Sequence, residues 1–186
     1  LAQAAEWWGG EDRLRAVEPG RVADRFRNHR TRRRTSRRGP AEGRALFFTA
    51  GVDSFFSLLC SPELPTHLVF VAGFDVELGD EERLAAMITS LRAVAHAVGV
   101  QSVVVSTDLR THPAFAAVSW EHTHGAALAA IGHLMHPAIG TVTISPSYGE
   151  ARLIPWGSRP DLDPRWSVPG RTIRSEEHTS ELQSRF

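Results

Sequence analysis

Short apolar runs alternate along this chain with segments whose apolar residues recur every three or four positions. The runs have the length and continuous apolar character of strands buried in a parallel sheet. They cover residues 45–48, 68–72 and 103–105, and residues 141–144 (Thr-Val-Thr-Ile) are expected to form a fourth strand. Because parallel strands need crossover connections, and helical patterns lie between these runs, the sequence predicts an α/β fold. We expect an open, mainly parallel, Rossmann-like sheet with helices on both faces.

The most regular helical pattern lies between the second and third runs. Asp80 suits an N-cap, and Glu81 and Glu82 place negative charge in the first turn, where the helix dipole favours it. Gly99 stands where helices commonly end in a left-handed residue. The apolar residues between them have helical spacing: Leu84, Met87, Ile88, Leu91, Val94, Ala95 and Val98. We expect this helix to cover one face of the sheet.

The first run leads through a turn of mostly small residues into a second helical pattern, in which Phe55, Leu58 and Leu59 share a face. A helix N-terminus offers backbone N–H groups without partners, and the helix dipole adds partial positive charge there. Small side chains let a phosphate approach that backbone. The pattern therefore predicts an anion site, with an ordinary strand–turn–helix junction as the alternative. The candidate residues are Thr49, Ala50, Gly51, Val52, Asp53 and Ser54.

Residues 49–54 resemble the Ser-Gly-Gly-x-Asp-Ser signature of the PP-loop ATP pyrophosphatases, a superfamily also described as adenine nucleotide alpha-hydrolase-like. The last four residues match the signature. Thr49 keeps the hydroxyl of the first position, and Ala50 replaces a glycine. An alanine costs on the order of 1 kcal/mol there if the position requires a positive φ. The resemblance is to bacterial members, spans about residues 44–167 and includes a distant similarity to the 7-cyano-7-deazaguanine synthases.

The resemblance implies ATP and Mg²⁺ as cofactors, with residues 49–54 holding the phosphates and Asp53 placing the metal. It implies that ATP is cleaved to AMP and pyrophosphate, so that a substrate oxygen is adenylated for an amide- or thio-type ligation. The second substrate would be a small molecule or RNA. A degenerate nucleotide-binding module without turnover is the alternative, and release of pyrophosphate from ATP would separate the two.

Two further sets of residues are candidates for the nucleotide site. Ligands in parallel sheets bind beyond the carboxyl ends of strands, so Gly73, Phe74 and Asp75, after the second run, should face the same crevice as the turn. The resemblance places them near the adenosine, and a turn with a capping aspartate is the alternative. His124 and Gly125 are candidates for a helix N-terminus that lines the nucleotide crevice.

A histidine cluster permits a metal-binding interpretation of the same region. Residues two apart do not share a helix face, and no neighbouring cysteine or pair of carboxylates completes a ligand set. A metal site is therefore the lesser alternative there. The cluster comprises His122, His124, His133 and His136.

A polar, Pro-rich segment near residues 156–167 contains two tryptophans and is a candidate substrate-binding surface. It faintly resembles the Gly-Tyr-Pro-Asp-Cys-Arg loop of the 7-cyano-7-deazaguanine synthases, with Asp161 in place of that aspartate and no cysteine. The candidate substrate-binding residues are Ser158, Arg159, Asp161 and Asp163.

Composition narrows the function classes. All 21 basic residues are arginine, which excludes a Walker-type phosphate loop because that loop requires lysine. Cys60 is the single cysteine, so no intramolecular disulfide and no cysteine zinc site can form. No apolar run approaches the ~18 residues of a membrane span. We expect a cytoplasmic protein without membrane contact, with a homodimer as one possible assembly.

Residues 13–38 carry eleven arginines against Glu18 and Asp24. Clustered arginines favour contacts with nucleic-acid phosphates, which makes an RNA-binding protein a further alternative. The densest part, residues 29–38, contains no Phe, Tyr or Trp on which a base could stack. An arginine-rich linker is therefore the preferred interpretation.

These patterns divide the chain into three parts. Residues 1–40 are expected to be an N-terminal fragment with an arginine-rich linker. Residues 41–173 are expected to form a PP-loop ATP-binding domain that is truncated at its C-terminus. Residues 174–186 resemble the in-frame translation of a sequencing adapter, and we expect them to make no packed contact with the domain.

Deletion of residues 1–40 should leave the cooperative unfolding transition nearly unchanged, because this segment carries too little apolar surface to offset the entropy of ordering it. Urea unfolding of the full chain and of the shortened chain measures this. A large loss of unfolding free energy in the shortened chain would show that the segment belongs to the folded domain.

Overall fold

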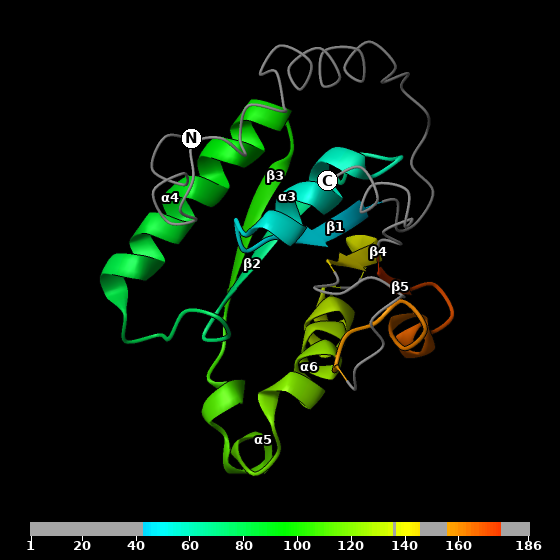
Figure 1. The fold of residues 1–186 in the computed structure, drawn as a ribbon. Coiled ribbons are helices and arrows are strands. Elements are labelled where there is room, and N and C mark those ends of the chain that lie inside the picture. Colours follow the sequence, from blue (N-terminus) through cyan, green and yellow to red (C-terminus); the bar gives the residue numbers. More distant parts are fainter. Residues whose placement is uncertain (1–42, 136, 146–155, 176–186) are drawn as a thin grey trace, which may run out of the picture. The chain divides into compact units, whose positions relative to one another are not determined.

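A computed structural model describes residues 43–135, 137–145 and 156–175 (Figure 1). The arginine-rich segment and the end of the chain after Ser175 lie outside the described residues. The strands are β1 (Gly43–Phe47), β2 (His67–Ala72), β3 (Gln101–Ser106), β4 (Ile139–Ile144) and β5 (Thr172–Ser175). The helices are α3 (Val52–Cys60), α4 (Glu81–Val98), α5 (Pro113–Ala116), α6 (Trp120–Leu134) and the short 3₁₀ turns η2 (Leu109–Thr111) and η4 (Asp163–Trp166).

All five strands are parallel and form one sheet in the order β3-β2-β1-β4-β5. The chain builds the sheet outward from β1 through β2 to β3, and then returns to the other edge of β1 to add β4 and β5. This is an α/β, Rossmann-like arrangement, and it confirms the fold class predicted from the sequence. The order of addition reverses between β1 and β4, a position that matters for ligand binding in such sheets.

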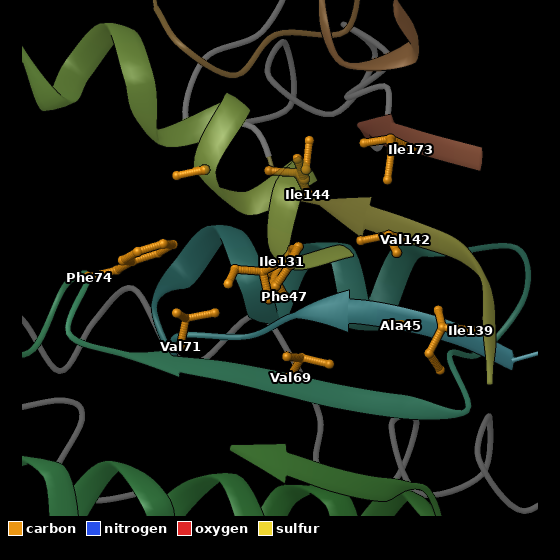
Figure 2. Packing of buried hydrophobic residues seen from close by; sticks show 12 residues of the cluster. Ala45, Phe47, Val69, Val71, Phe74, Ile131, Ile139, Val142, Ile144 and Ile173 are labelled. Atoms are coloured by element: carbon orange, nitrogen blue, oxygen red, sulfur yellow. The ribbon is translucent and has the colours of Figure 1, made fainter. Parts of the chain in front are cut away.

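Residues of β1 alternate between two apolar layers, as the two-residue period of a strand requires. Ala45 and Phe47 belong to a cluster that includes Ile131 of α6 (Figure 2). Leu46 and the adjoining Phe48 belong to the cluster on the opposite face, to which α3 and α4 contribute. Helices therefore cover both faces of the sheet, as expected, and the central strand is buried on each side.

Helix α4 begins and ends where the sequence predicts. Asp80 is its N-cap, and its side chain accepts a hydrogen bond from the backbone N–H of Arg83 at 3.1 Å. Gly99 ends the helix with φ of 74° in the left-handed region. Leu91 is fully buried on the face that meets the sheet.

Helix α6 begins earlier than the sequence pattern indicates. Residues 109–122 have no clear period in the sequence and would be expected to form a loop, but η2, α5 and the first residues of α6 occupy most of that segment. Ser119 is the N-cap of α6. His124 and Gly125 consequently lie in the second turn of the helix, and their predicted place at its N-terminus is wrong.

The sheet also extends past the predicted end of the domain. Strand β5 includes Arg174 and Ser175, which pair with β4. Ser175 is buried and Arg174 donates a hydrogen bond to the hydroxyl of Thr143 at 3.2 Å. The expectation that residues 174–186 make no packed contact is therefore wrong for their first two residues. Residues 176–186 lie outside the described part of the chain.

Among the helices that the structure describes, none combines the length and the apolar character needed to cross a bilayer.

The buried face of α4 should contribute strongly to stability. Leu91→Ala removes a side chain with 0% exposure and should lower the unfolding free energy by about 2–5 kcal/mol, through lost transfer energy and the cavity left behind. Leu134→Ala, at the end of α6 with 80% exposure, is the matched control and should change it by less than about 0.5 kcal/mol. Urea unfolding of both variants tests the assignment, and equal losses would contradict it.

Candidate functional site

The turn between β1 and α3 has an unusual backbone. Ala50 has φ of 56° and is the only non-glycine residue with a positive φ in the described part of the chain. Gly51 is the N-cap of α3 and makes no side-chain hydrogen bond to the helix. The rings of Phe48 and Phe55 flank the turn and meet edge to face, with centroids 5.0 Å apart. The contact between these rings packs together the residues on either side of the turn. Within the turn, Ala50 has a left-handed conformation that alanine rarely adopts.

A cleft of about 280 Å³ opens beside this turn. It lies over the carboxyl ends of β1, β2 and β4, and therefore at the point where the strand order reverses. Its apolar lining is Phe47, Phe48, Val69, Val71, Phe74, Trp120, Leu128, Ile144 and Trp156. Its polar lining is Thr49, Asp53, Ser54, Asp75, Glu121, His124, Ser145 and Ser158.

One wall of the cleft depends on a close approach between two backbones. The N–H of Gly157 donates to the carbonyl oxygen of Glu121 at 2.6 Å. A Cβ atom on Gly125 would lie 1.8 Å from the carbonyl oxygen of Gly157, and a Cβ on Gly157 would lie 2.7 Å from the carbonyl carbon of His122. Only glycine fits either position without a shift of the backbone. This contact brings residues 156–158 against α6.

Four aromatic rings follow one another along this wall. Phe74 meets Trp120 edge to face with centroids 4.8 Å apart. The centroid of the His124 ring lies 6.2 Å from that of Trp120, one turn earlier in the helix. It lies 5.5 Å from the centroid of the Trp156 ring, on the other side of the glycine contact. We call Phe74, Trp120, His124 and Trp156 the aromatic row. Because residues four apart share a helix face, α6 fixes the central pair of the row.

The outer side of the row is also anchored. The guanidinium carbon of Arg110 lies 5.1 Å from the centroid of the Trp120 ring, and this arginine donates to the carbonyl oxygen of Phe74. Arg110 does not line the cleft. It therefore occupies one face of the indole and ties the segment after β2 to the start of α6.

Ser158 reaches the cleft from a buried polar cluster. Its hydroxyl donates to Oδ2 of Asp163 at 2.7 Å, and the hydroxyl of Ser175 in β5 donates to the same oxygen. Asp163 has 0% exposure, and its Oδ1 has no hydrogen-bond partner among the described residues. Burial raises the pKa of this carboxyl, while the two serine hydroxyls, the Arg159 backbone and the charge of His124 act in the opposite direction.

The cleft brings together seven of the residues predicted from the sequence. They come from the turn after β1, the segment after β2, α6 and the segment before η4, which are far apart in the chain. They are Thr49, Asp53, Ser54, Phe74, Asp75, His124 and Ser158.

The other predicted residues do not line the cleft, and several have structural roles. Gly73 has φ of 97°, and a Cβ there would lie 1.8 Å from the carbonyl oxygen of Thr107. Val52 is 63% exposed. Arg159 and Asp161 form an ion pair with Nη2 and Oδ2 2.6 Å apart. The remaining four outside the lining are Ala50 and Gly51 in the turn, Gly125 in the backbone contact and Asp163 beneath Ser158.

Sequence reasoning did not assign Trp120 or Glu121 to the site. A signal for both exists: Ser119 is a residue type suited to an N-cap, and Glu121 places negative charge in the following turn. A helix begun there puts Trp120 and His124 on one face. Trp156 belongs to the segment 156–167 that the sequence indicated as a candidate binding surface, but its place beside His124 depends on the contact between Gly125 and Gly157.

Potential metal ligands are scattered in the part of the chain that the structure describes. Within the described ranges, no three His, Cys, Asp or Glu side chains are grouped so that they could hold an ion. His136 lies outside those ranges. Asp53 lines the cleft as a single carboxylate beside the helix N-terminus, an arrangement suited to a metal that takes most of its ligands from phosphates and water.

Comparisons with protein families, curated proteins and solved structures found no match to this chain.

The buried Asp163 should make stability depend on pH. Its pKa is higher in the folded chain than in the unfolded chain, so its protonated form stabilises the fold and that stability is lost as pH rises through the raised pKa. Asp163→Asn removes this titration. The unfolding free energy of the parent minus that of the variant should fall as pH rises from about 3 to 7. Urea unfolding across this range measures it, and a difference that is constant or increases would refute it.

Proposed function

We propose that the cleft binds ATP with Mg²⁺, and that the protein cleaves ATP between the α- and β-phosphates to adenylate a substrate oxygen for an amide- or thio-type ligation. The observation that carries this proposal is the position of the cleft. It lies at the reversal of strand order, with the N-terminus of α3 and the turn 49–51 at its edge. In open α/β sheets this is where nucleotides bind.

The turn itself suits a polyphosphate. Gly51, the N-cap of α3, has no side chain to cap the first-turn N–H groups, so within the described residues these groups suit an anion. Gly51 presents no side chain, and the left-handed Ala50 redirects the backbone between strand and helix. A strained residue held by its surroundings at such a turn is a common feature of ligand sites.

The charge of the cleft explains why a metal would accompany the nucleotide. The described lining contains the carboxylates of Asp53, Asp75 and Glu121 and no arginine. Free ATP would be repelled there, and Mg²⁺ would weaken this repulsion by cancelling part of the phosphate charge. Mg²⁺ would neutralise the phosphate charge and favour the departure of pyrophosphate. Asp53, at the start of α3, is the residue that would hold it, since Mg²⁺ commonly takes one or two carboxylates together with phosphates and waters.

The size of the cleft is consistent with part of a nucleotide. Its volume of about 280 Å³ is near the lower end of the range for small-molecule sites. Its apolar floor, formed by side chains such as Val71 and Ile144, would accept a base. The rest of the ligand would extend into the open mouth.

A second candidate is a nucleotide-binding module without turnover, and two observations favour it. Ala50 places a Cβ at a position where the signature has glycine and where φ is positive. The hydroxyl hydrogen of Ser54 is engaged with the carbonyl oxygen of Gly51, at 2.9 Å, instead of being free for a phosphate. Pyrophosphate release in the presence of ATP and Mg²⁺ distinguishes the two candidates. The arginine-rich segment that would support RNA binding lies outside the described residues.

Asp53→Asn should weaken Mg²⁺-dependent ATP binding about ten-fold or more, because it removes a charged metal ligand while keeping the side-chain size. Glu82→Gln, an exposed carboxylate change in the first turn of α4, is the matched control and should leave affinity unchanged. Ala50→Gly should maintain or raise affinity, since it relieves the strain at positive φ. Calorimetric titration of ATP with Mg²⁺ measures all three. Absence of binding to the parent protein at about millimolar ATP would refute the proposed site.

A further inference from the structure

The hydrogen bonds around the cleft determine which polar groups it can offer to a ligand. The hydroxyl of Ser158 donates its hydrogen to Asp163, and that of Ser54 donates to the carbonyl oxygen of Gly51. Each hydroxyl has one hydrogen, so only oxygen lone pairs remain. Nδ1 of His124 lies 3.1 Å from the carbonyl oxygen of Trp120, which can only accept, so Nδ1 carries the hydrogen. When the imidazole is uncharged, Nε2 is an acceptor.

The charged groups of the lining have the same character. Asp53, Asp75 and Glu121 are carboxylates, and the sequence contains no lysine that could offset them. Two arginines of the described residues that lie next to lining residues have other partners: Arg110 lies against the ring of Trp120, and Arg159 pairs with Asp161. Apart from the hydroxyls of Thr49 and Ser145 and the two indole N–H groups, the polar side chains of the described lining are therefore mainly acceptors. On the side away from the turn after β1, a ligand that supplies hydrogens and positive charge is favoured.

Two of the three carboxylates have no role in the proposed nucleotide site. Asp53 is assigned to Mg²⁺, whereas Asp75 and Glu121 directly follow Phe74 and Trp120 of the aromatic row in sequence. Aromatic faces attract cations through their quadrupole. An aromatic row flanked by carboxylates is therefore suited to an ammonium group on an apolar body.

Ser158 gives independent support to this assignment. Its side chain lines the cleft although the residue is only 4% exposed, and the buried Asp163 holds its hydroxyl in one orientation. Asp163 is itself held by Ser175 of β5. The cluster acts as a positioning device that presents an oxygen acceptor, and not a hydroxyl donor, to the cleft.

We propose that the wall formed by the aromatic row, Asp75, Glu121 and Ser158 binds a primary ammonium group carried on an apolar or aromatic body. Binding of such an amine depends only on the lining of the cleft. Its role as the second substrate of the ligation rests on the proposed function. A divalent cation bound by these groups is the competing occupant, but no suitable group of three ligands occurs among the described residues.

Three probes of similar shape test the charge preference directly. Benzylamine, benzyl alcohol and benzoate are titrated separately into the full chain at neutral pH, with binding followed by ligand-observed saturation-transfer NMR. Benzylamine should bind about ten-fold more tightly than benzyl alcohol, and benzoate should not bind. Equal affinity for the amine and the alcohol, or preferred binding of benzoate, overturns the proposal. Displacement of benzylamine by Mg²⁺ alone, without ATP, would assign the wall to the metal and also overturn it.

Two variants locate the site. Glu121→Gln keeps the shape of the side chain and should reduce the affinity for benzylamine about five-fold or more while leaving that for benzyl alcohol unchanged. Glu82→Gln should change neither. Trp156→Leu should weaken the binding of both probes, and Trp166→Leu, a change outside the cleft lining, is its control. Circular dichroism establishes that each variant is folded, and a folded Glu121→Gln protein with undiminished amine preference refutes the assignment.

Titration of the same proteins with ATP and Mg²⁺ separates this proposal from the proposed function. Binding of ATP without a preference for the amine would overturn the amine site alone. Binding of the amine without binding of ATP would overturn the nucleotide function and leave the amine site standing.

Discussion

Strand β1 is paired with a parallel strand along each edge and covered by an apolar layer on each face. It is also the described strand that leads through the turn into α3. Because strands on both sides run in the same direction, their carboxyl ends meet at one edge of the sheet. The cleft exists at that edge because β4 joins the free side of β1, which leaves the helices that follow β1 and precede β4 on opposite faces.

The two sides of the cleft are built in different ways. The turn after β1 is local: its residues are neighbours in the chain, and the ring contact between Phe48 and Phe55 holds it. The α6 side is assembled from distant segments and depends on Gly125 and Gly157, whose lack of side chains allows two backbones to meet. In the proposed function, the local side would bind phosphate and metal, and the assembled side would distinguish one substrate from another.

This difference explains how much the sequence could predict. Strands β1, β2, β3 and β4 contain short segments rich in apolar or β-branched residues, and α4 has a cap at each end, so their positions follow from local patterns. Strand β5 escaped detection because Thr172–Ser175 contains a single apolar residue, Ile173, whose burial depends on β4 and α6. The start of α6 was missed because its first turn has few apolar residues. The sequence marked the segment of Trp156 as a candidate surface, but only the fold shows that this ring lies beside His124. Features that depend on neighbouring residues could therefore be predicted from the sequence, whereas the α6 side of the cleft could be identified only from the tertiary structure.

The left-handed conformation of Ala50 has a consequence for the evolution of this turn. Alanine and glycine codons differ at one base, so a single mutation can add or remove the methyl group at this position. In the unfolded chain, the methyl group reduces the number of backbone conformations, which favours folding. In the folded chain, it adds strain at a positive φ, which opposes folding. Each effect on the unfolding free energy is on the order of 1 kcal/mol. Selection can therefore adjust how firmly the turn closes around a ligand in one genetic step, without altering Asp53, Ser54 or any residue of the opposite wall.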